Sequence, residues 1–175
     1  DTVSTPEDEA ILIDVLNNDS DVDGDDLEVI SVTDPANGTA AIQNGQQVLY
    51  TPDADFYGSD SFEYTISDGN GETASAMVYI TVTPLNDPPV VSGIPDQTID
   101  EGGSFAAINL NDYVSDVDNS AAEMTWSYSG NVELMVSIDE NRIATIGIPH
   151  PDWFGVETIT FTATDPEGLS GSDQA

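Results

Sequence analysis

The sequence contains no cysteine and a single basic residue, Arg142, against 34 acidic residues. Disulfides and thiol chemistry are therefore excluded. Nucleic acids and anionic membrane surfaces are excluded as partners, because binding their phosphates requires clustered Lys and Arg. No run approaches the roughly 18 consecutive apolar residues of a membrane-spanning helix. These absences leave a strongly anionic chain whose partners are neutral or cationic.

The formal net charge of -33 is accompanied by an ordinary content of apolar residues, 38% of the chain. Acidic chains are often disordered, because their charges repel and they bury little apolar surface. Here the apolar residues recur in short runs along the whole sequence, which is enough for a core. Charge and core are compatible if bound cations neutralise part of the charge, and metal ions commonly stabilise small modules without disulfides. The composition therefore predicts a folded, cation-binding protein.

The sequence repeats itself after about 97 residues, which indicates two homologous modules. The matching segments are Phe56-Tyr57-Gly58 with Trp153-Phe154-Gly155, Asp68 with Asp165, Ser20-Asp21-Val22-Asp23 with Ser115-Asp116-Val117-Asp118, and Glu7 with Glu101. We assign residues 1–87 to module 1 and residues 88–175 to module 2. The prolines of the connector, residues 84–89, predict a short, stiff link outside any strand. Because Ala175 corresponds to Val78, we expect the last strand of module 2 to be truncated.

Apolar and polar residues alternate in both modules, which predicts strands and not helices. Phe62 and Tyr64 alternate with polar neighbours in module 1, and Phe161 and Ala163 do so in module 2. Turn signals such as Asn44-Gly45 separate these runs. About seven short strands in a module of this size indicate a sandwich. The predicted fold class is all-β, with two tandem immunoglobulin-like antiparallel β-sandwiches.

Residues 17–26 form an acidic loop with the sequence Asn-Asn-Asp-Ser-Asp-Val-Asp-Gly-Asp-Asp. Alternating aspartates before a glycine form the first half of an EF-hand loop, whose oxygens converge on calcium. A complete EF-hand is excluded, because Ile30 takes the place of its final glutamate and no flanking helix is predicted. Two alternatives remain, an acidic loop that supplies hard oxygen ligands to a cation and a solvated loop without an ion. The recurrence of Asp-Val-Asp in module 2 favours the cation.

Several motifs follow one another in a fixed order: Glu7-Asp8, Val15-Leu16-Asn17-Asn18-Asp19-Ser20-Asp21, Asn37-Gly38-Thr39, Tyr50-Thr51-Pro52, Phe56-Tyr57-Gly58-Ser59-Asp60-Ser61-Phe62, Tyr64-Thr65-Ile66-Ser67-Asp68-Gly69 and Asn86-Asp87-Pro88-Pro89-Val90. This order resembles bacterial cadherin-like modules, which occur in tandem in adhesins and polysaccharide-degrading proteins. The resemblance covers nearly the whole chain, and module 2 is also similar to dystroglycan-type cadherin-like domains. It implies a cadherin-like fold, Ca²⁺ as the cofactor, and an extracellular or cell-surface location.

The resemblance also implies a set of calcium ligands. At the junction of the two modules they would be Glu7, Asp53 or Asp55, Asn86, Asp87, Asp116, Asp118 and Asp165. The counterparts in module 1, Asp21, Asp23 and Asp68, would serve a junction with a preceding module. The usual linker of the family has an additional Asp-x pair before Asn-Asp, whereas this chain has Pro84 and Leu85. The resemblance therefore leaves the number of ions at the junction open.

Two functions agree with the resemblance, and a third is remote. The modules could form a rigid spacer or an adhesive array, with neighbouring repeats or like modules on other chains as partners. They could instead bind polysaccharide through exposed aromatic platforms, for which Trp126 and Trp153 are candidates, although both positions also fit core packing. A hydrolase is disfavoured, because small sandwiches seldom enclose a cleft that holds two carboxylates at a defined separation. We expect no enzymatic activity.

Overall fold

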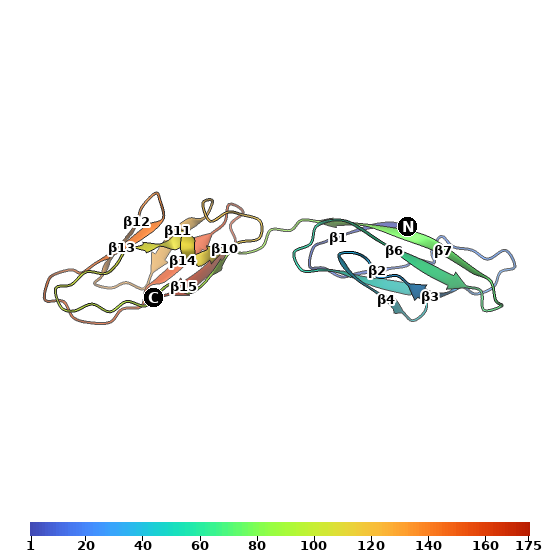
Figure 1. Ribbon diagram of the computed structural model, residues 1–175, viewed down its shortest axis with the longest axis horizontal. Coiled ribbons are helices and arrows are strands. Elements are labelled where there is room, and N and C mark those ends of the chain that lie inside the picture. Colours follow the sequence, from blue (N-terminus) through green and yellow to red (C-terminus); the bar gives the residue numbers. More distant parts are fainter. The chain divides into compact units, whose positions relative to one another are not determined.

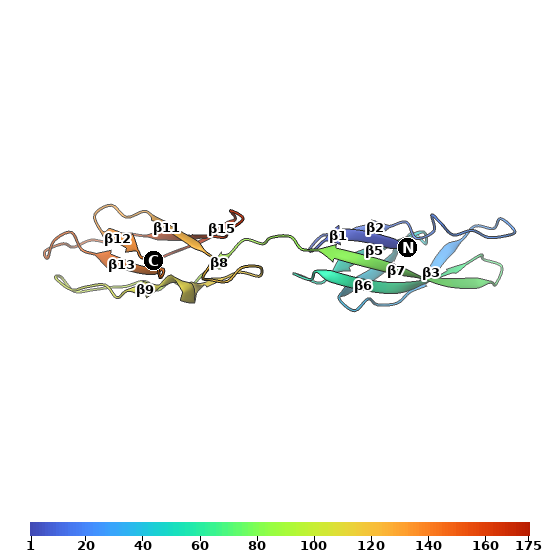
Figure 2. The ribbon, with the colours of Figure 1, turned by 90° about the horizontal axis from the view of Figure 1, so that it is seen from above.

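The computed structural model describes all 175 residues and divides them into two compact units, Asp1–Leu85 and Asn86–Ala175. Both units consist of strands joined by turns and loops, and the whole chain contains one short 3-10 helix (Figures 1 and 2). The all-β prediction is therefore confirmed. No helix in the structure has the length and apolar character needed to cross a membrane.

Unit 1 contains seven strands in two sheets. The strands are β1 (Thr2–Pro6), β2 (Ile11–Ile13), β3 (Glu28–Val32), β4 (Gly38–Gln43), β5 (Gln47–Pro52), β6 (Gly58–Ser67) and β7 (Thr73–Thr83). One sheet has the order β1-β7-β6-β3 and the other the order β2-β5-β4. Buried residues of both sheets meet in one core cluster, so unit 1 is a two-layer sandwich.

The predicted alternation determines which side chains form the core of unit 1. On β6, Phe62 and Tyr64 are buried at 1% exposure, and the glutamate between them is exposed. On β7, Val78, Ile80 and Val82 are buried, whereas Tyr79 remains 58% exposed. Strand side chains point alternately to the two faces of a sheet. The apolar set of each strand therefore faces the opposing sheet, as the sequence predicts.

One pairing in unit 1 departs from the predicted antiparallel arrangement. Strand β1 lies parallel to β7, with Thr2 opposite Tyr79 and Pro6 opposite Thr83. The other pairs of unit 1 are antiparallel. Parallel neighbours require a long crossover, and here β2 to β6 intervene between the two strands. The alternation in sequence cannot distinguish the two directions.

The Asn44-Gly45 turn joins β4 to β5, as predicted. Both residues have positive φ, 54° for Asn44 and 68° for Gly45. Glycine adopts this conformation without steric cost, and asparagine tolerates it better than most residues. The turn therefore closes the hairpin that aligns Gly38 with Pro52 at the opposite ends of β4 and β5.

Unit 2 repeats this plan with shorter strands. They are β8 (Val90–Val91), β9 (Ile108–Asn109), β10 (Val114–Ser115), β11 (Thr125–Ser129), β12 (Met135–Ile138), β13 (Ile143–Gly147), β14 (Thr160–Thr164) and β15 (Ser170–Gln174), with the 3-10 helix η1 (Leu110–Tyr113) after β9. The sheets have the orders β11-β14-β15, β12-β13-β9 and β10-β8. Phe161 and Ala163 of β14 are fully buried in a core cluster of their own. Unit 2 is thus a second, less regular sandwich.

The proline-containing connector, residues 84–89, forms no strand. Each end is attached to its own unit. The N–H of Leu85 donates to Oε1 of Glu7 within unit 1, and the Nδ2 group of Asn86 donates to Oδ2 of Asp165 within unit 2. Two neighbouring residues of the connector are therefore held by acidic side chains that the sequence analysis singles out.

Candidate metal-binding sites

Glu7 is buried at the end of unit 1 from which the connector leaves. It follows β1 directly, and only 1% of its surface is exposed. Its N–H donates to the carbonyl of Thr83 at 2.9 Å, which extends the β1–β7 ladder by one residue. Its Oε1 accepts from the N–H of Leu85 at 2.6 Å, and its Oε2 is buried without a hydrogen-bond partner. The ladder thus holds a carboxylate in the interior with one oxygen unsatisfied.

A second buried carboxylate, Asp60, shows how unit 1 satisfies such a group without an ion. Its oxygens accept from the N–H groups of Ala36 and Asn37 at 3.1 and 3.0 Å, and from the hydroxyl of Tyr50 at 3.0 Å. Burial raises the pKa of Tyr50, and the bond to Asp60 raises it further, so the phenol stays protonated and donates. Both oxygens of Asp60 accept hydrogen bonds, whereas Oε2 of Glu7 has no partner. Glu7 therefore keeps an oxygen that can bind a cation.

Two exposed aspartates adjoin Glu7 at this end of unit 1. The N–H of Asp55 donates to Oδ1 of Asp8 at 3.2 Å, and a carboxylate oxygen of each residue lies within 4.8 Å of the other. Both residues have positive φ, 60° for Asp8 and 58° for Asp55. Asp53 is also exposed, and its N–H donates to the carbonyl of Asn37 at 2.9 Å. Of the two predicted alternatives, Asp53 and Asp55, it is Asp55 that lies beside another carboxylate at this end. That carboxylate, Asp8, was not among the predicted ligands.

The remaining candidates of unit 1 lie at its other end. Asp68 precedes β7 and Leu85 follows it, so the eleven-residue strand separates the two ends by about 33 Å. Oδ1 of Asp68 accepts from the N–H groups of Asn70, Gly71 and Glu72 at 2.8, 3.0 and 3.0 Å. These backbone bonds, with that of Asn70 the strongest, hold the pKa of Asp68 below its ordinary value of 3.8. Asp68 therefore remains ionised under all but acidic conditions.

The acidic loop of residues 17–26 lies next to Asp68. Oδ1 of Asp21 accepts from the N–H groups of Asp23 and Asp25 at 2.7 and 3.2 Å. The Nδ2 group of Asn70 donates to Oδ2 of Asp25 at 2.8 Å, which links this loop to the one that contains Asp68. The structure therefore brings Asp21, Asp23 and Asp68 to the same end of unit 1.

In unit 2, five predicted ligands are connected by hydrogen bonds at the end where the connector enters. Oδ2 of Asp165 accepts from Asn86 at 2.7 Å, and Oδ2 of Asp118 accepts from the N–H of Asp87 at 2.9 Å. Oδ1 of Asp116 accepts from the N–H of Asp118 at 2.9 Å. The connector residues and the Asp-Val-Asp loop thus form one oxygen-rich site within unit 2.

Asp165 is ionised in this site even though it is 4% exposed. Burial alone would raise its pKa, but bonds from Asn86 and from the N–H groups of Leu169 and Gly168 outweigh that effect and leave the pKa below 3.8. The bond from Asn86 uses the donor side of the amide, so its carbonyl oxygen remains available as a ligand. The site therefore presents anionic and amide oxygens together.

Asn119 is a candidate ligand that the sequence analysis missed. Its N–H donates to Oδ1 of Asp116 at 2.8 Å, and its own Oδ1 is buried without a hydrogen-bond partner. The second carboxylate oxygen of Asp116, Oδ2, is also buried and unpartnered. Gly24 occupies the corresponding position in module 1, so the repeat gave no signal.

The two tryptophans proposed as sugar platforms are both half-buried and pack against the core of unit 2. The indole N–H of Trp126 is buried without a partner, whereas that of Trp153 donates to Oε2 of Glu133 at 2.6 Å. Platform stacking requires an open ring face, and the most exposed aromatic ring nearby belongs to Phe154, at 89%. Polysaccharide binding through the tryptophans stays a prediction without structural support.

A family model described as a bacterial Ig domain matches residues 1–81 and again residues 86–175. Among curated proteins, the chain is similar to Protein GAMETE EXPRESSED 2 of Arabidopsis thaliana, with 33% identity over 141 residues. That match includes 77% of this chain but only 15% of the relative, so the whole relative is far longer than the shared region.

Several solved structures align with nearly the whole chain, among them a cadherin ectodomain fragment and an endo-fucoidan hydrolase. The cadherin ectodomain fragment PcdhgB3 EC1-4 covers 99% of this chain and 46% of its own, with 16% identity and a TM-score of 0.51. The endo-fucoidan hydrolase MfFcnA4 from glycoside hydrolase family 107 covers 99% of this chain and 26% of its own, with 20% identity and a TM-score of 0.38. The first likeness establishes a shared fold alone, and the second is too low to establish even that. The predicted immunoglobulin-like, cadherin-like fold is confirmed.

Proposed function

Because the chain belongs to the bacterial Ig domain family and carries two such domains in tandem, we propose that it is a calcium-binding spacer or adhesion segment of a larger extracellular protein. Its role in this proposal is mechanical and not catalytic. Calcium would hold the connector to the modules, and neighbouring repeats or like modules on other chains would be the partners.

The observation that carries the proposal is the buried carboxylate of Glu7. Residues 1–85 contain no Lys, Arg or His, so no basic side chain of unit 1 can neutralise it. An uncompensated buried charge costs several kcal/mol even after the protein relaxes. A bound cation at Oε2 would remove that cost and satisfy the orphaned oxygen at the same time. The buried Oδ2 of Asp116 supports the same conclusion for unit 2.

Calcium is the cation that these donors fit best. Ca²⁺ takes six to eight oxygen ligands in flexible geometry, from carboxylates, amide and backbone carbonyls, and water. Mg²⁺ demands a nearly ideal octahedron and gives up its water reluctantly. The sites offer carboxylates and amide oxygens on loops, without His or Cys. This donor set favours hard cations over transition metals.

Calcium of this kind is most useful outside the cell. Extracellular calcium modules have dissociation constants of roughly 10⁻⁴ to 10⁻³ M. At a hundredfold excess over the dissociation constant, one site stabilises the folded state by about 2.7 kcal/mol. That is a large share of the roughly 5–15 kcal/mol that stabilises a small domain. In a cytosol poor in free calcium the same sites would stay empty.

The first prediction concerns the calcium dependence of thermal stability. We expect calcium to raise the melting temperature of the chelator-treated chain by about 6 °C or more, and magnesium to raise it much less. Glu7→Gln removes the buried charge while keeping the size of the side chain. The variant should therefore melt no lower than the original chain in chelator, but should lose part of the calcium-dependent rise. Scanning calorimetry in chelator, calcium and magnesium measures both quantities.

Glu9→Gln is the matched control, because Glu9 is an exposed carboxylate two residues away. It should keep the full response to calcium. Equal calcium responses in Glu7→Gln and Glu9→Gln would show that the effect comes from general charge screening and would refute the assignment of Glu7. Equal effects of calcium and magnesium in the original chain would refute a calcium site.

A further inference from the structure

Module 1 contains three Asn-Gly pairs, Asn37-Gly38, Asn44-Gly45 and Asn70-Gly71, and module 2 contains none. Asparagine is a thermolabile residue, because the backbone nitrogen of the next residue can attack Cγ of its side chain. A bond forms between that nitrogen and Cγ, the bond from Cγ to Nδ2 breaks, and Nδ2 leaves as ammonia with the proton of the backbone nitrogen. Water then opens the succinimide ring to aspartate or isoaspartate. Glycine favours ring closure, because it has no side chain to obstruct the attack.

The backbone around Asn37-Gly38 is fixed from both sides. Asn37 donates its N–H to Oδ2 of Asp60 at 3.0 Å, and its carbonyl accepts from the N–H of Asp53 at 2.9 Å. Gly38 begins β4, and a Cβ atom placed on it would lie 2.5 Å from the carbonyl oxygen of Thr51. Ring closure would require this peptide to rotate into space that backbone already occupies. The reaction at Asn37 therefore requires that end of the β4–β5 hairpin to open first.

Asn44 is exposed, but its backbone conformation prevents the attack. It is the one asparagine with positive φ, 54°. In this left-handed conformation ψ is about 47°, which places the nitrogen of the next residue on the side of Cα opposite to Cβ. The nitrogen of Gly45 therefore reaches Cγ only after the turn changes conformation. The carbonyl of Gly45 accepts from the N–H of Val29 at 2.8 Å, which ties the turn to β3 and opposes that change.

Asn70-Gly71 lies in the loop between β6 and β7 and meets neither obstacle. Asn70 does not have positive φ, both residues are exposed, and apart from the chain neighbours of Gly71 no atom lies within 4 Å of the place that a Cβ atom on Gly71 would take. The N–H of Gly71 donates to Oδ1 of Asp68 at 3.0 Å, and Nδ2 of Asn70 donates to Oδ2 of Asp25 at 2.8 Å. Both bonds are exposed, so water can replace the partners at small cost. The attacking nitrogen and the leaving amide thus become free while every strand stays intact.

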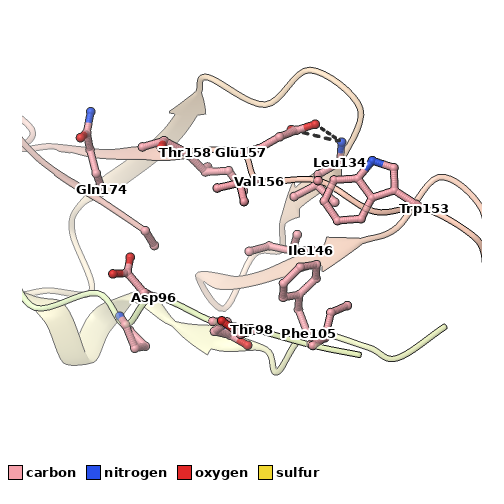
Figure 3. A pocket seen from close by; sticks show the side chains of 16 residues that line it. Asp96, Thr98, Phe105, Leu134, Ile146, Trp153, Val156, Glu157, Thr158 and Gln174 are labelled. Atoms are coloured by element: carbon pink, nitrogen blue, oxygen red, sulfur yellow. Dashed lines mark hydrogen bonds between the residues drawn. The ribbon is translucent and has the colours of Figure 1, made fainter. Parts of the chain in front are cut away.

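Solvent exposure alone does not make an amide reactive, as Gln174 of β15 shows. Gln174 is exposed and lies beside an open cavity of about 530 Å³ in unit 2 (Figure 3). Its side chain is one methylene longer than that of asparagine, so attack by the next nitrogen would have to close a larger ring. That nitrogen belongs to Ala175 and already donates to the carbonyl of Ile159 at 3.0 Å. Gln174 therefore serves as an internal reference that should stay unmodified.

We propose that Asn70 is a site of spontaneous modification, which converts with time into aspartate and isoaspartate. The conversion breaks the contact between the β6–β7 loop and the acidic loop of residues 17–26. The oxygen that replaces Nδ2 cannot donate to Asp25, so two carboxylates face each other where a hydrogen bond of 2.8 Å was. Like charges at such a separation repel. Isoaspartate also lengthens the main chain by one methylene, which displaces the N–H of Gly71 from Asp68.

A consequence for ion binding rests on the proposed function. Asp21, Asp23 and Asp68 are candidate ligands at this end of unit 1, and the conversion adds a negative charge beside them. The converted chain should therefore be less stable in chelator, where the repulsion is uncompensated, and should gain more stability from calcium. The order of conversion rates among the asparagines does not depend on calcium binding. The modification site and its consequence for calcium can therefore be refuted separately.

The test incubates the folded chain in chelator at mildly alkaline pH, below its melting temperature, in water enriched in a heavy oxygen isotope. Peptide mapping by mass spectrometry then measures conversion at each asparagine, because ring opening during the incubation incorporates the labelled oxygen. We expect Asn70 to convert at least about tenfold faster than Asn37 and Asn44, because those two require local opening. In urea, where the folded conformations are lost, the three rates should agree within about threefold.

Equal rates at the three asparagines in the folded chain, or faster conversion at Asn44, would overturn the proposal. The same holds if Asn70 stays intact in the folded chain while it converts in urea. In that case the exposed bonds to Asp25 and Asp68 would be protective. Conversion of Gln174 at the rate of Asn70 would show that exposure alone controls the reaction, and would overturn the geometric argument.

Asn70→Asp tests the consequence for calcium, and Asn44→Asp is the matched control because it adds the same charge in the β4–β5 turn. We expect calcium to raise the melting temperature of Asn70→Asp by about 4 °C more than that of Asn44→Asp. Equal rises in the two variants would refute the effect of the modification on calcium binding. A calcium response that is missing from the original chain and from both variants would refute the proposed function, whereas the order of conversion rates would still decide the modification site.

Discussion

At the scale of single residues, carboxylates in this protein frequently serve as acceptors for clusters of backbone N–H groups. Glu157 is an example outside the candidate metal sites. Its oxygens accept from the N–H groups of Val132 and Glu133 at 2.8 and 2.7 Å, and from that of Leu134 at 3.3 Å. Burial would raise the pKa of Glu157, but these three bonds lower it below the ordinary value of 4.5. The ionised side chain thus fixes the loop before β12.

We predict that Glu157→Gln destabilises unit 2 in a pH-dependent manner. Because the folded-state pKa is lowered, the ionised group stabilises the fold above pH 4.5, and this contribution is lost as the pH falls through the lowered pKa. The variant should be less stable than the original chain by about 1 kcal/mol at pH 6, a value that allows for solvent screening of a half-buried group. Urea unfolding as a function of pH measures the difference.

The difference should shrink steadily as the pH is lowered below 4.5. Glu140→Gln is the control, since Glu140 is exposed and lies in a turn of the same unit. A difference between Glu157→Gln and the original chain that does not change with pH would mean that the amide perturbs packing and that the charge of Glu157 is unimportant.

The sequence identifies some of these residues and not others, for physical reasons. Asp165 and Asp116 were found because each has a counterpart one repeat earlier, Asp68 and Asp21 respectively. The role of Glu157 depends on a loop more than twenty residues earlier in the chain, and no local pattern encodes such a contact. The same applies to Asn119, whose unpartnered oxygen becomes apparent only when its burial is known.

At the scale of secondary structure, local alternation determines strands only where a partner is present. The alternation in β6, β7 and β14 correctly predicted both the strands and their buried faces. It could not predict that β1 pairs in parallel, because direction is decided by the path of the chain between the strands. Residues 96–100 correspond to β1 in the repeat but form no strand.

Strand β15 also depends on a close approach that the sequence does not reveal. Gly171 lies against the segment that leads into β8, and a Cβ atom added there would lie 1.9 Å from the carbonyl oxygen of Pro89. The corresponding position in module 1 is Ala74, so the repeat does not require glycine. The requirement arises from the tight packing of the connector onto β15.

We therefore predict that Gly171→Ala destabilises unit 2 by about 2 kcal/mol, because backbone must move to accommodate one methyl group. Ser172→Ala, at the neighbouring exposed position on β15, should change the free energy of unfolding by less than about 0.5 kcal/mol. Urea unfolding of both variants and of the original chain measures these differences in the free energy of unfolding. Equal stabilities would show that the strand can shift away from Pro89 at negligible cost.

At the scale of the whole molecule, 34 acidic residues and one basic residue create a repulsion that acts on both units. Salt screens exposed charges over a Debye length of about 10 Å at 0.1 M. We predict that raising sodium chloride from about 0.05 to 0.5 M in chelator increases the melting temperature by several degrees. With calcium bound, part of the charge is already neutralised, so the same change in salt should have a smaller effect.

Calorimetric scans at matched ionic strength, with and without calcium, separate the two contributions. Potassium chloride serves as a control for specific sodium binding. If salt raised the melting temperature equally in calcium and in chelator, calcium would not be bound at the carboxylates that dominate the repulsion.

The parallel pairing of β1 with β7 determines how unit 1 carries tension. The chain enters unit 1 at the start of β1 and leaves it at the end of β7, and in a parallel pair these points lie at opposite ends of the ladder. Pulling on both ends therefore shears the five residue pairs from Thr2–Tyr79 to Pro6–Thr83 together, instead of peeling them apart one by one. Under load, unit 1 should therefore resist until all five pairs break together, and should then unfold in a single step.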